Sequence, residues 1–179
     1  MIRAFAAIAL PEAARFELML AGQGLPAPRL QPPESLHLTL VFLGDLPRRT
    51  LEDVDLAFGQ VRAPGFELGL AGMGLFGGSK PRVAWVGAAE NPALRHLQAK
   101  VETAARGAGV ELQARRFAPH VTLARLPERL AGRERLEAAV AARGGYRVPA
   151  FPVEDFRLYR SHLGGEGPLY EELARYPLG

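Results

Sequence analysis

A four-residue pattern, His-x-Thr-Leu, occurs twice in this 179-residue chain and constrains its fold more than any other feature. The copies are His37 to Leu40 and His120 to Leu123, so the two histidines lie 83 residues apart (120 − 37). Each copy falls in a short apolar run that predicts a strand. Because residues two apart on a strand share a face, each histidine shares a face with its threonine, and the apolar neighbours face the opposite way.

The segments around the two copies repeat one order of elements: strand, helix, strand, helix, strand. In the first half we expect strands at 2–9, 36–43 and 66–75. The first helix should run from Pro11 to Gly22, with Phe16, Met19 and Leu20 inward. The second should be capped by Thr50 and Asp53, and its apolar stripe is Leu51, Val54, Phe58 and Val61. In the second half we expect strands at 82–87, 117–125 and 153–159, a helix over 91–107 with Asn91 as N-cap, and a helix over 133–143.

The first strands of the two halves begin 80 residues apart (82 − 2), so the tetrads keep register with an internal duplication. This arrangement predicts an α+β fold of two pseudo-symmetric βαβαβ lobes around a central cleft. The length fits one domain over residues 1–179.

Composition excludes several classes of site and leaves others open. The chain has no cysteine, which removes disulfides, zinc-thiolate sites and thiol nucleophiles. The apolar run from Ala4 to Leu10 is too short for a signal-peptide core or a membrane span, and we expect a soluble cytoplasmic protein. The net charge is only +3, but all basic residues except Lys80 and Lys100 are arginine, which suits an anionic partner or reflects a compositional bias of the source.

Two facing imidazoles suit in-line displacement at phosphorus. One histidine can deprotonate the attacking oxygen while the other protonates the departing oxygen, since both protonation states of imidazole are accessible near neutral pH. The threonine hydroxyls of Thr39 and Thr122 can donate to the non-bridging phosphate oxygens. Neither tetrad contains a carboxylate or a second histidine at ligand spacing, so we expect no metal and no other cofactor.

Further segments extend the pattern over nearly the whole chain. They are residues 5–11 (FAAIALP), 33–44 (PESLHLTLVFLG), 119–125 (PHVTLAR), 158–161 (LYRS) and 167–170 (GPLY). With the paired tetrads, they resemble the bacterial and archaeal RNA 2′,3′-cyclic phosphodiesterases, also called 2′-5′ RNA ligases. The resemblance implies the bilobal two-histidine phosphoesterase fold and hydrolysis of an RNA 2′,3′-cyclic phosphate to a 2′-phosphate. Some members also join RNA reversibly through a 2′-5′ linkage, and the resemblance implies that this chain can do so. We expect a monomer that does not associate with membranes.

The resemblance assigns catalysis to His37, His120, Thr39 and Thr122, a phosphate contact to Arg125 and a base-stacking aromatic to Phe42. Strand geometry disagrees for the last two residues, because each lies five positions after its histidine, an odd offset that points to the other face. For Phe42, plain core packing is an equally good interpretation. For Arg125 we predict that the strand becomes irregular between Leu123 and Arg125, so that the guanidinium turns toward the phosphate.

Two other classes of function stay open: a catalytically silent RNA-binding module and a metal-dependent phosphodiesterase. The two histidine roles are also open. The working hypothesis places Phe42 and the nucleoside beside His37, which would make His37 the acid at the 3′ oxygen. Arg125 would then hold the phosphate beside His120, the base that activates water.

Overall fold

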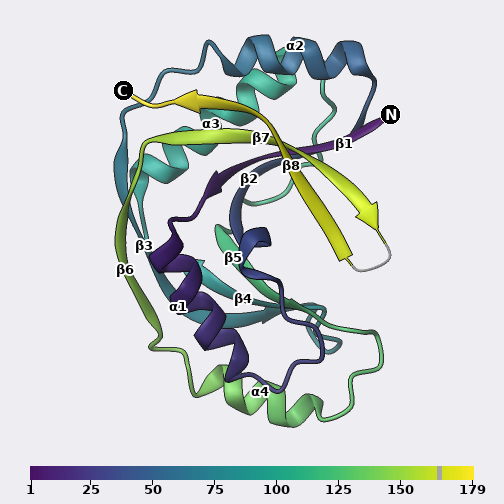
Figure 1. Cartoon of the computed structure of the whole chain (residues 1–179), viewed down its shortest axis with the longest axis vertical. Helices are drawn as coiled ribbons and strands as arrows, with labels where there is room; N and C mark the ends of the chain where they lie inside the picture. Colours follow the sequence, from purple (N-terminus) through teal and green to yellow (C-terminus); the bar gives the residue numbers. More distant parts are fainter. Residues whose placement is uncertain (165–166) are drawn as a thin grey trace.

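The computed structural model describes residues 1–164 and 167–179, which form one antiparallel sheet with helices on both of its sides (Figure 1). The sheet has eight strands in the order β6-β3-β4-β5-β2-β1-β7-β8. The strands are β1 (Ile2–Ala9), β2 (His37–Leu46), β3 (Phe66–Phe76), β4 (Val83–Ala88), β5 (His120–Arg125), β6 (Arg147–Val153), β7 (Asp155–Gly164) and β8 (Gly167–Pro177). The helices are α1 (Glu12–Gln23), the short 3₁₀ helix η1 (Pro33–Ser35), α2 (Arg48–Phe58), α3 (Pro92–Gly107) and α4 (Arg133–Ala141).

The sheet consists of two halves of four strands that meet at the two tetrad strands, β2 and β5. One half is β2-β1-β7-β8 and the other is β5-β4-β3-β6. Leu38 and Val121 are the aligned pair that joins them. The halves confirm the expected pseudo-symmetric lobes, but the third strand of each repeat crosses over: β3 pairs with β4 of the second repeat, and β7 pairs with β1 of the first. The two repeats are therefore interlocked through their strands.

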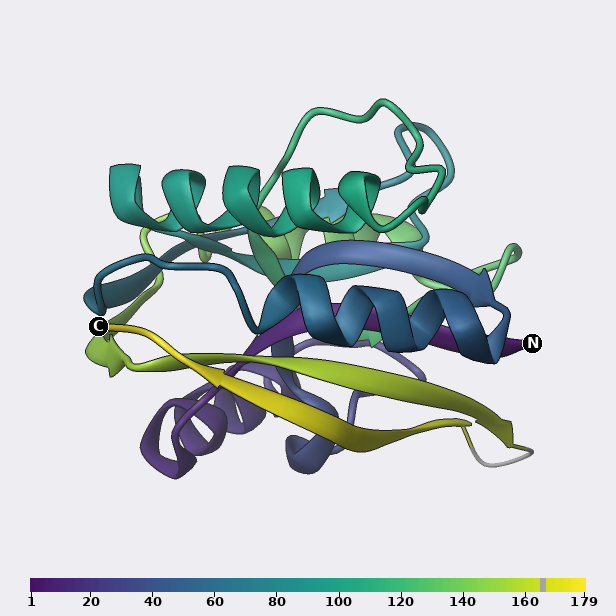
Figure 2. The ribbon, with the colours of Figure 1, turned by 90° about the horizontal axis from the view of Figure 1, so that it is seen from above.

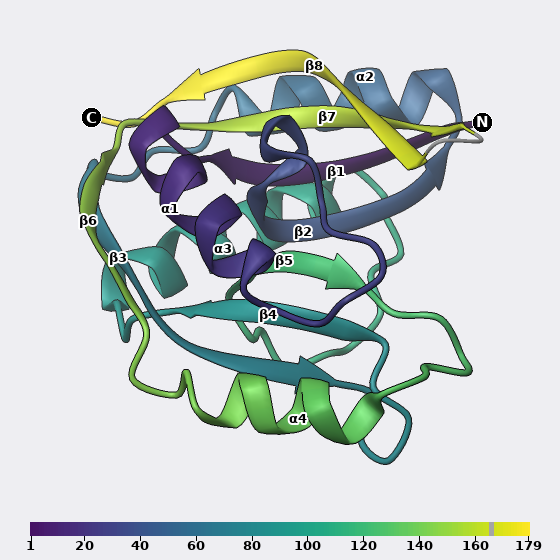
Figure 3. The ribbon, with the colours of Figure 1, turned by 60° about the horizontal axis from the view of Figure 1, so that its bottom comes forward.

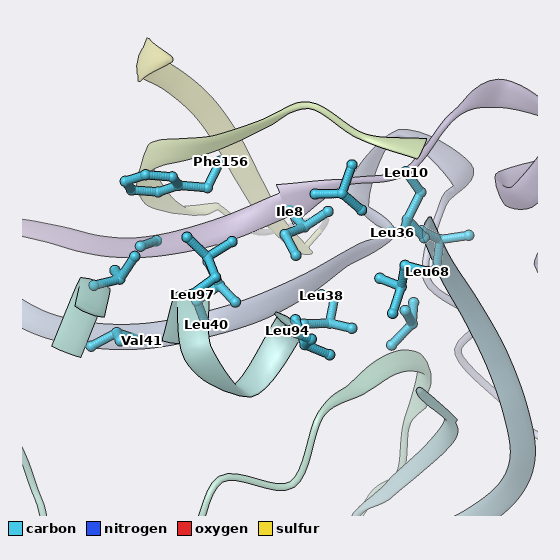
Figure 4. Close-up of a cluster of buried hydrophobic side chains, with 14 of the residues drawn as sticks. Ile8, Leu10, Leu36, Leu38, Leu40, Val41, Leu68, Leu94, Leu97 and Phe156 are labelled. Atoms are coloured by element: carbon cyan, nitrogen blue, oxygen red, sulfur yellow. The ribbon is translucent and has the colours of Figure 1, made fainter. Parts of the chain in front are cut away.

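The helices cover both sides of this sheet. Figure 2 shows α3 and α1 on opposite sides of the strands, and Figure 3 shows α4 along β3 at the far edge from α2. Packing against α3 buries one face of β2: Leu38 and Leu40 lie near Leu94 and Leu97, and none of the four is more than 3% exposed (Figure 4). The opposite face of β2, which carries His37 and Thr39, is left to form a site.

The structure confirms the predicted Asn91 cap, whose side-chain oxygen accepts a hydrogen bond from the Leu94 backbone N–H at 3.0 Å. The predicted capping pair of Thr50 and Asp53 is wrong, because α2 begins at Arg48 and its N-cap is Pro47, three residues before Thr50. Pro47 provides the extended backbone that precedes a helix without a side-chain cap.

The predicted inward stripe of the first helix is also wrong. Phe16 is 54% and Leu20 46% exposed, whereas Ala14 and Leu18 are buried. The helix lies along β5 and β6. Close approach to the sheet favours the face that carries the small residue Ala14 over the face that carries Phe16. Strands β6 and β8 were not expected; both contain prolines and charged residues, as is common for strands at the edges of a sheet.

Candidate active site

The two tetrads lie side by side at the centre of the sheet. Leu38 pairs with Val121, and the two strands are antiparallel. One residue before Leu38 therefore lies across from one residue after Val121, which places His37 across from Thr122 and, by the same step, Thr39 across from His120. Leu38 and Val121 are fully buried, while all four polar side chains are half-buried on the opposite face. The tertiary structure thus brings together the four residues that the sequence predicted as catalytic.

The two histidines make the same hydrogen bond. Nδ1 of His37 lies 2.7 Å from the carbonyl oxygen of Ser35, and Nδ1 of His120 lies 2.7 Å from that of Ala118. A carbonyl oxygen only accepts, so each Nδ1 must carry the hydrogen and donate it. Nε2 is therefore the nitrogen that gains or loses a proton in both rings, as an acid/base pair requires.

Each tetrad strand contains a β-bulge directly after its threonine. Along β5, Thr122 pairs with Trp85 but Ala124 pairs with Ala84, which leaves Leu123 as an extra residue. Along β2, Thr39 pairs with Ala7 and Val41 with Ala6, which leaves Leu40 as the extra residue. In both strands two successive side chains are then buried, Leu40 with Val41 and Leu123 with Ala124.

The bulges return the residue five positions after each histidine to the histidine face. Arg125 pairs with Val83, two residues from Trp85 on the partner strand, so it shares a face with Thr122. The predicted irregularity is confirmed, although it begins one residue earlier, at Leu123. Phe42 is returned in the same way and is 51% exposed, so it is not a core residue. The guanidinium of Arg3 lies over the Phe42 ring at 4.8 Å from its centroid.

Burial and positive charge lower the pKa of both histidines. For His37, burial is the main cause, with added repulsion from Arg125 and His120, and together they lower its pKa to about 4. For His120, which is less buried, burial and then Arg125 lower the pKa from 6.5. The charge of Arg125 thus acts on both imidazoles, and the charge of His120 acts on His37, so the three groups face one site.

Antiparallel pairing exchanges the expected neighbours of the two histidines. Phe42 follows Thr39, which lies across from His120, and these three residues line one cavity of about 510 Å³. Arg125 follows Thr122, which lies across from His37. The expectation that Phe42 accompanies His37 is therefore wrong: residues close in sequence to one histidine lie at the level of the other, because β2 and β5 run in opposite directions.

Aromatic side chains that the sequence analysis missed hold both imidazoles. The His37 ring lies 4.8 Å from that of Phe5 and 5.0 Å, edge to face, from that of Tyr170. The His120 ring lies 4.8 Å, edge to face, from that of Phe76. These contacts come from strands distant in the chain. Only Phe5 and Tyr170, which fall in the family-like segments at residues 5–11 and 167–170, carried a signal in the sequence.

The indole of Trp85 completes the wall beside His120, at 6.4 Å between ring centroids. It lies across Gly74 of the neighbouring strand, where a Cβ would overlap the six-membered ring. Glycine at position 74 therefore makes room for the indole, which also packs against Phe76 at 5.0 Å.

Three cavities in the described part of the chain are each lined by one of the two tetrad histidines. His37 lines a cavity of about 590 Å³, and His120 lines the one that contains Phe42 and a smaller one of about 270 Å³ beside Trp85. No one of these three cavities is lined by both histidines, which lie on the neighbouring strands β2 and β5. Within residues 1–164 and 167–179, no three histidine, aspartate or glutamate side chains group as a metal site would require.

Comparison with known proteins agrees with this geometry. The family model described as "2'-5' RNA ligase superfamily" matches residues 8–165. A Geobacillus stearothermophilus RNA 2′,3′-cyclic phosphodiesterase is 36% identical over 81% of this chain and 46% of its own length, so the chain spans about half of that relative. An Aeropyrum pernix protein of the same name is 31% identical over 89% of this chain and 91% of its own.

Solved structures show the same fold. The crystal structure of Escherichia coli LigT complexed with 3′-AMP matches with a TM-score of 0.80 and 29% identity, over 99% of this chain and 98% of that one. The crystal structure of a Thermus thermophilus protein, TT0787, matches with a TM-score of 0.78 and 31% identity, over 98% and 97%. The fold, the paired tetrads and the family match together show that this chain belongs to the 2′-5′ RNA ligase superfamily.

Proposed function

We propose that this protein hydrolyses the 2′,3′-cyclic phosphate at the end of an RNA strand to a 2′-phosphate. The observation that carries the proposal is the matched pair of imidazoles, each held by Nδ1 on a backbone carbonyl, with its Nε2 free for proton transfer. Relatives at 36% and 31% identity that are named RNA 2′,3′-cyclic phosphodiesterases support the choice of substrate.

In this mechanism His37 is the base and His120 is the acid. His37 is the more buried of the two, with a pKa of about 4, so its Nε2 is unprotonated at neutral pH and can accept a proton from water. The water oxygen attacks phosphorus, the bond from phosphorus to the 3′ oxygen breaks, and His120 donates its Nε2 proton to that oxygen. This assignment of base and acid is the reverse of the one expected from the sequence, in which Phe42 accompanied His37 and His37 was the acid.

The neighbouring residues hold the substrate for this displacement. Thr39 and Thr122 lie across from the histidines and donate to the non-bridging oxygens, and Arg125 neutralises the phosphate. Phe42, exposed in the cavity beside His120, stacks on the terminal base, which places the 3′ oxygen at the acid. Arg115 and Arg116 also line that cavity, and their positive charges suit the phosphate on the 5′ side of the terminal nucleotide.

The same roles permit RNA joining, in which a 5′-hydroxyl replaces water and a 2′-5′ linkage forms.

We propose that residues 1–179 act as one domain, since the two halves share one sheet, and that the protein works as a cytoplasmic monomer on RNA ends. Among the described residues, no helix is long and apolar enough to cross a membrane. The reaction needs no cofactor.

The test is incubation with an oligonucleotide that ends in a 2′,3′-cyclic phosphate, with and without a chelator. We expect a 2′-phosphate product at equal rates in both. Formation of a 3′-phosphate would contradict the proposed bond cleavage, and loss of activity in chelator would favour a metal-dependent phosphodiesterase. Binding without turnover would favour a silent RNA-binding module.

A further inference from the structure

Strand β2 contains a second bulge, directly after Phe42. Along β1 and β2, Phe5 pairs with Phe42 but Ala4 pairs with Gly44, which leaves Leu43 as an extra residue. Gly44 has a φ of 78°, a left-handed conformation that favours glycine. The bulge therefore changes which side chains beyond Phe42 point to the face of the sheet that carries the tetrad histidines.

The pair that this bulge brings to the histidine face is Arg3 and Asp45. The two residues are aligned across β1 and β2, and Nη1 of Arg3 donates a hydrogen bond to Oδ2 of Asp45 at 3.2 Å. Arg3 lies two residues before Phe5 and shares its face, which is also the face of Phe42. The same guanidinium lies 4.8 Å from the centroid of the Phe42 ring. Asp45 thus holds a cation over one face of this ring.

The Phe42 ring keeps another side for a ligand. Phe42 is 51% exposed and lines the cavity of about 510 Å³ beside His120. Arg3 is not among the residues that line this cavity, so its guanidinium supports the ring from outside. The carboxylate of Asp45 also offsets the charge of Arg3, which favours a role toward the ring over a contact with phosphate.

We propose that Arg3, oriented by Asp45, is a positioning residue for the terminal base of the substrate. The inference rests on the proposed function, in which Phe42 stacks on that base. A cation is attracted to the negative face of an aromatic ring, and this attraction holds the ring in one orientation before the substrate binds. A ring that is already held loses less conformational freedom on binding. Arg3 therefore strengthens stacking through Phe42 and takes no part in the chemical step.

The first experiment compares two ligands by NMR titration of the full-length protein. Adenosine 2′-phosphate has a base, and methyl riboside 2-phosphate has none. Arg3→Ala should raise the Kd of adenosine 2′-phosphate about two- to fivefold, the strength of an exposed cation–π contact, and leave the Kd of the base-free ligand unchanged. Arg3→Lys keeps a cation and should recover part of the loss. Asp45→Asn should also raise the Kd of adenosine 2′-phosphate, because it releases the guanidinium.

A double-mutant cycle tests whether Arg3 acts through Phe42. Phe42→Ala alone should raise the Kd of adenosine 2′-phosphate about tenfold, from the loss of stacking. In the Phe42→Ala protein, Arg3→Ala should have no further effect. An exposed ion pair contributes little to folding, so the variants at positions 3 and 45 should fold. The control Arg147→Ala removes an exposed arginine from β6, at the edge of the sheet, and should change neither Kd.

Several outcomes would overturn the inference. An equal loss of affinity for both ligands in Arg3→Ala, or the same loss in the Phe42→Ala background, would show that Arg3 contacts the phosphate directly. Unchanged binding of adenosine 2′-phosphate in Arg3→Ala would show that the ring needs no support. A protein that binds both ligands equally, or neither, has no stacking site for Arg3 to support.

Hydrolysis tests the proposed function separately. If the unaltered protein does not hydrolyse an oligonucleotide that ends in a 2′,3′-cyclic phosphate, the proposed function fails, while the Kd values still decide the role of Arg3. If it does, Arg3→Ala should raise KM for this oligonucleotide and leave kcat unchanged. A fall in kcat with KM unchanged would place Arg3 in the chemical step and overturn the inference.

Discussion

Phe42 and Arg125 occupy equivalent positions in the two halves of the sheet. Each lies five residues after a tetrad histidine, and in each strand a bulge at the intervening leucine returns the side chain to the histidine face. The duplication has thus kept the backbone irregularity and changed the residue that uses it. One position presents an aromatic ring for stacking, and the other presents a positive charge for the phosphate.

The roles of the histidines predict different responses to an activated leaving group. His37→Ala and His120→Ala should each lose about 10² to 10⁴-fold in kcat with RNA, the usual contribution of a general base or acid. A substrate whose 3′ leaving group needs no protonation should largely restore His120→Ala and leave His37→Ala impaired. Rescue of His37→Ala instead would assign the acid to His37.

The lowered pKa values predict the pH dependence of kcat/KM. The active free protein has His37 neutral and His120 protonated, so kcat/KM should fall below about pH 4 and should also fall as pH rises through the His120 pKa, which lies below 6.5. Bound phosphate favours the imidazolium, so kcat should persist to higher pH than kcat/KM. A profile of kcat/KM that rises through pH 7 would contradict these roles.

Replacing Arg125 should change this profile as well as the rate. Arg125→Gln removes a positive charge that lowers the pKa of both histidines, so the alkaline limb of kcat/KM should move to higher pH while the rate falls. NMR titration of the His120 ring would measure the same shift directly. Arg129→Gln is a suitable control, since Arg129 is an exposed arginine beyond the end of β5. An unchanged alkaline limb in Arg125→Gln would show that the guanidinium does not act on the site.

Burial of His37 should make the protein less stable in acid. Its pKa is about 4 in the folded chain and 6.5 when unperturbed, so the unfolded state binds more protons between these values. The free energy of unfolding should fall as pH drops from 6.5 to 4, by at most roughly 3 kcal/mol for this group. Denaturant melts of His37→Gln should show a flatter pH dependence over this window; an equally steep fall would place the effect elsewhere.

Gly74 should tolerate no side chain without movement of Trp85. Gly74→Ala places a methyl group where the indole lies, and we expect a loss of about 1 to 3 kcal/mol of stability, as for overpacked sites. The displaced indole should also disturb Phe76 and His120 and reduce kcat. Gly145→Ala is the matched control, since no atom lies within 4 Å of a Cβ at that position. Equal stability of both variants, with unchanged tryptophan fluorescence, would contradict this packing.

Much of this protein is determined by local sequence. The alternation around His37 and His120 specifies two strands with a polar face, because side-chain direction on a strand has a period of two. The spacing of the tetrads specifies two equivalent halves, and Asn91 specifies a helix start through a contact three residues away. These features depend on near neighbours in the chain, which a sequence displays directly.

Other features were decided only by the tertiary structure. The bulges after Thr39 and Thr122 depend on partner strands that take two successive side chains into the core. The pairing of Phe42 with His120 depends on β2 running antiparallel to β5, and the lowered pKa of His37 depends on burial under rings from β1 and β8. Register, strand direction and desolvation arise between segments far apart in the chain, so no local pattern records them.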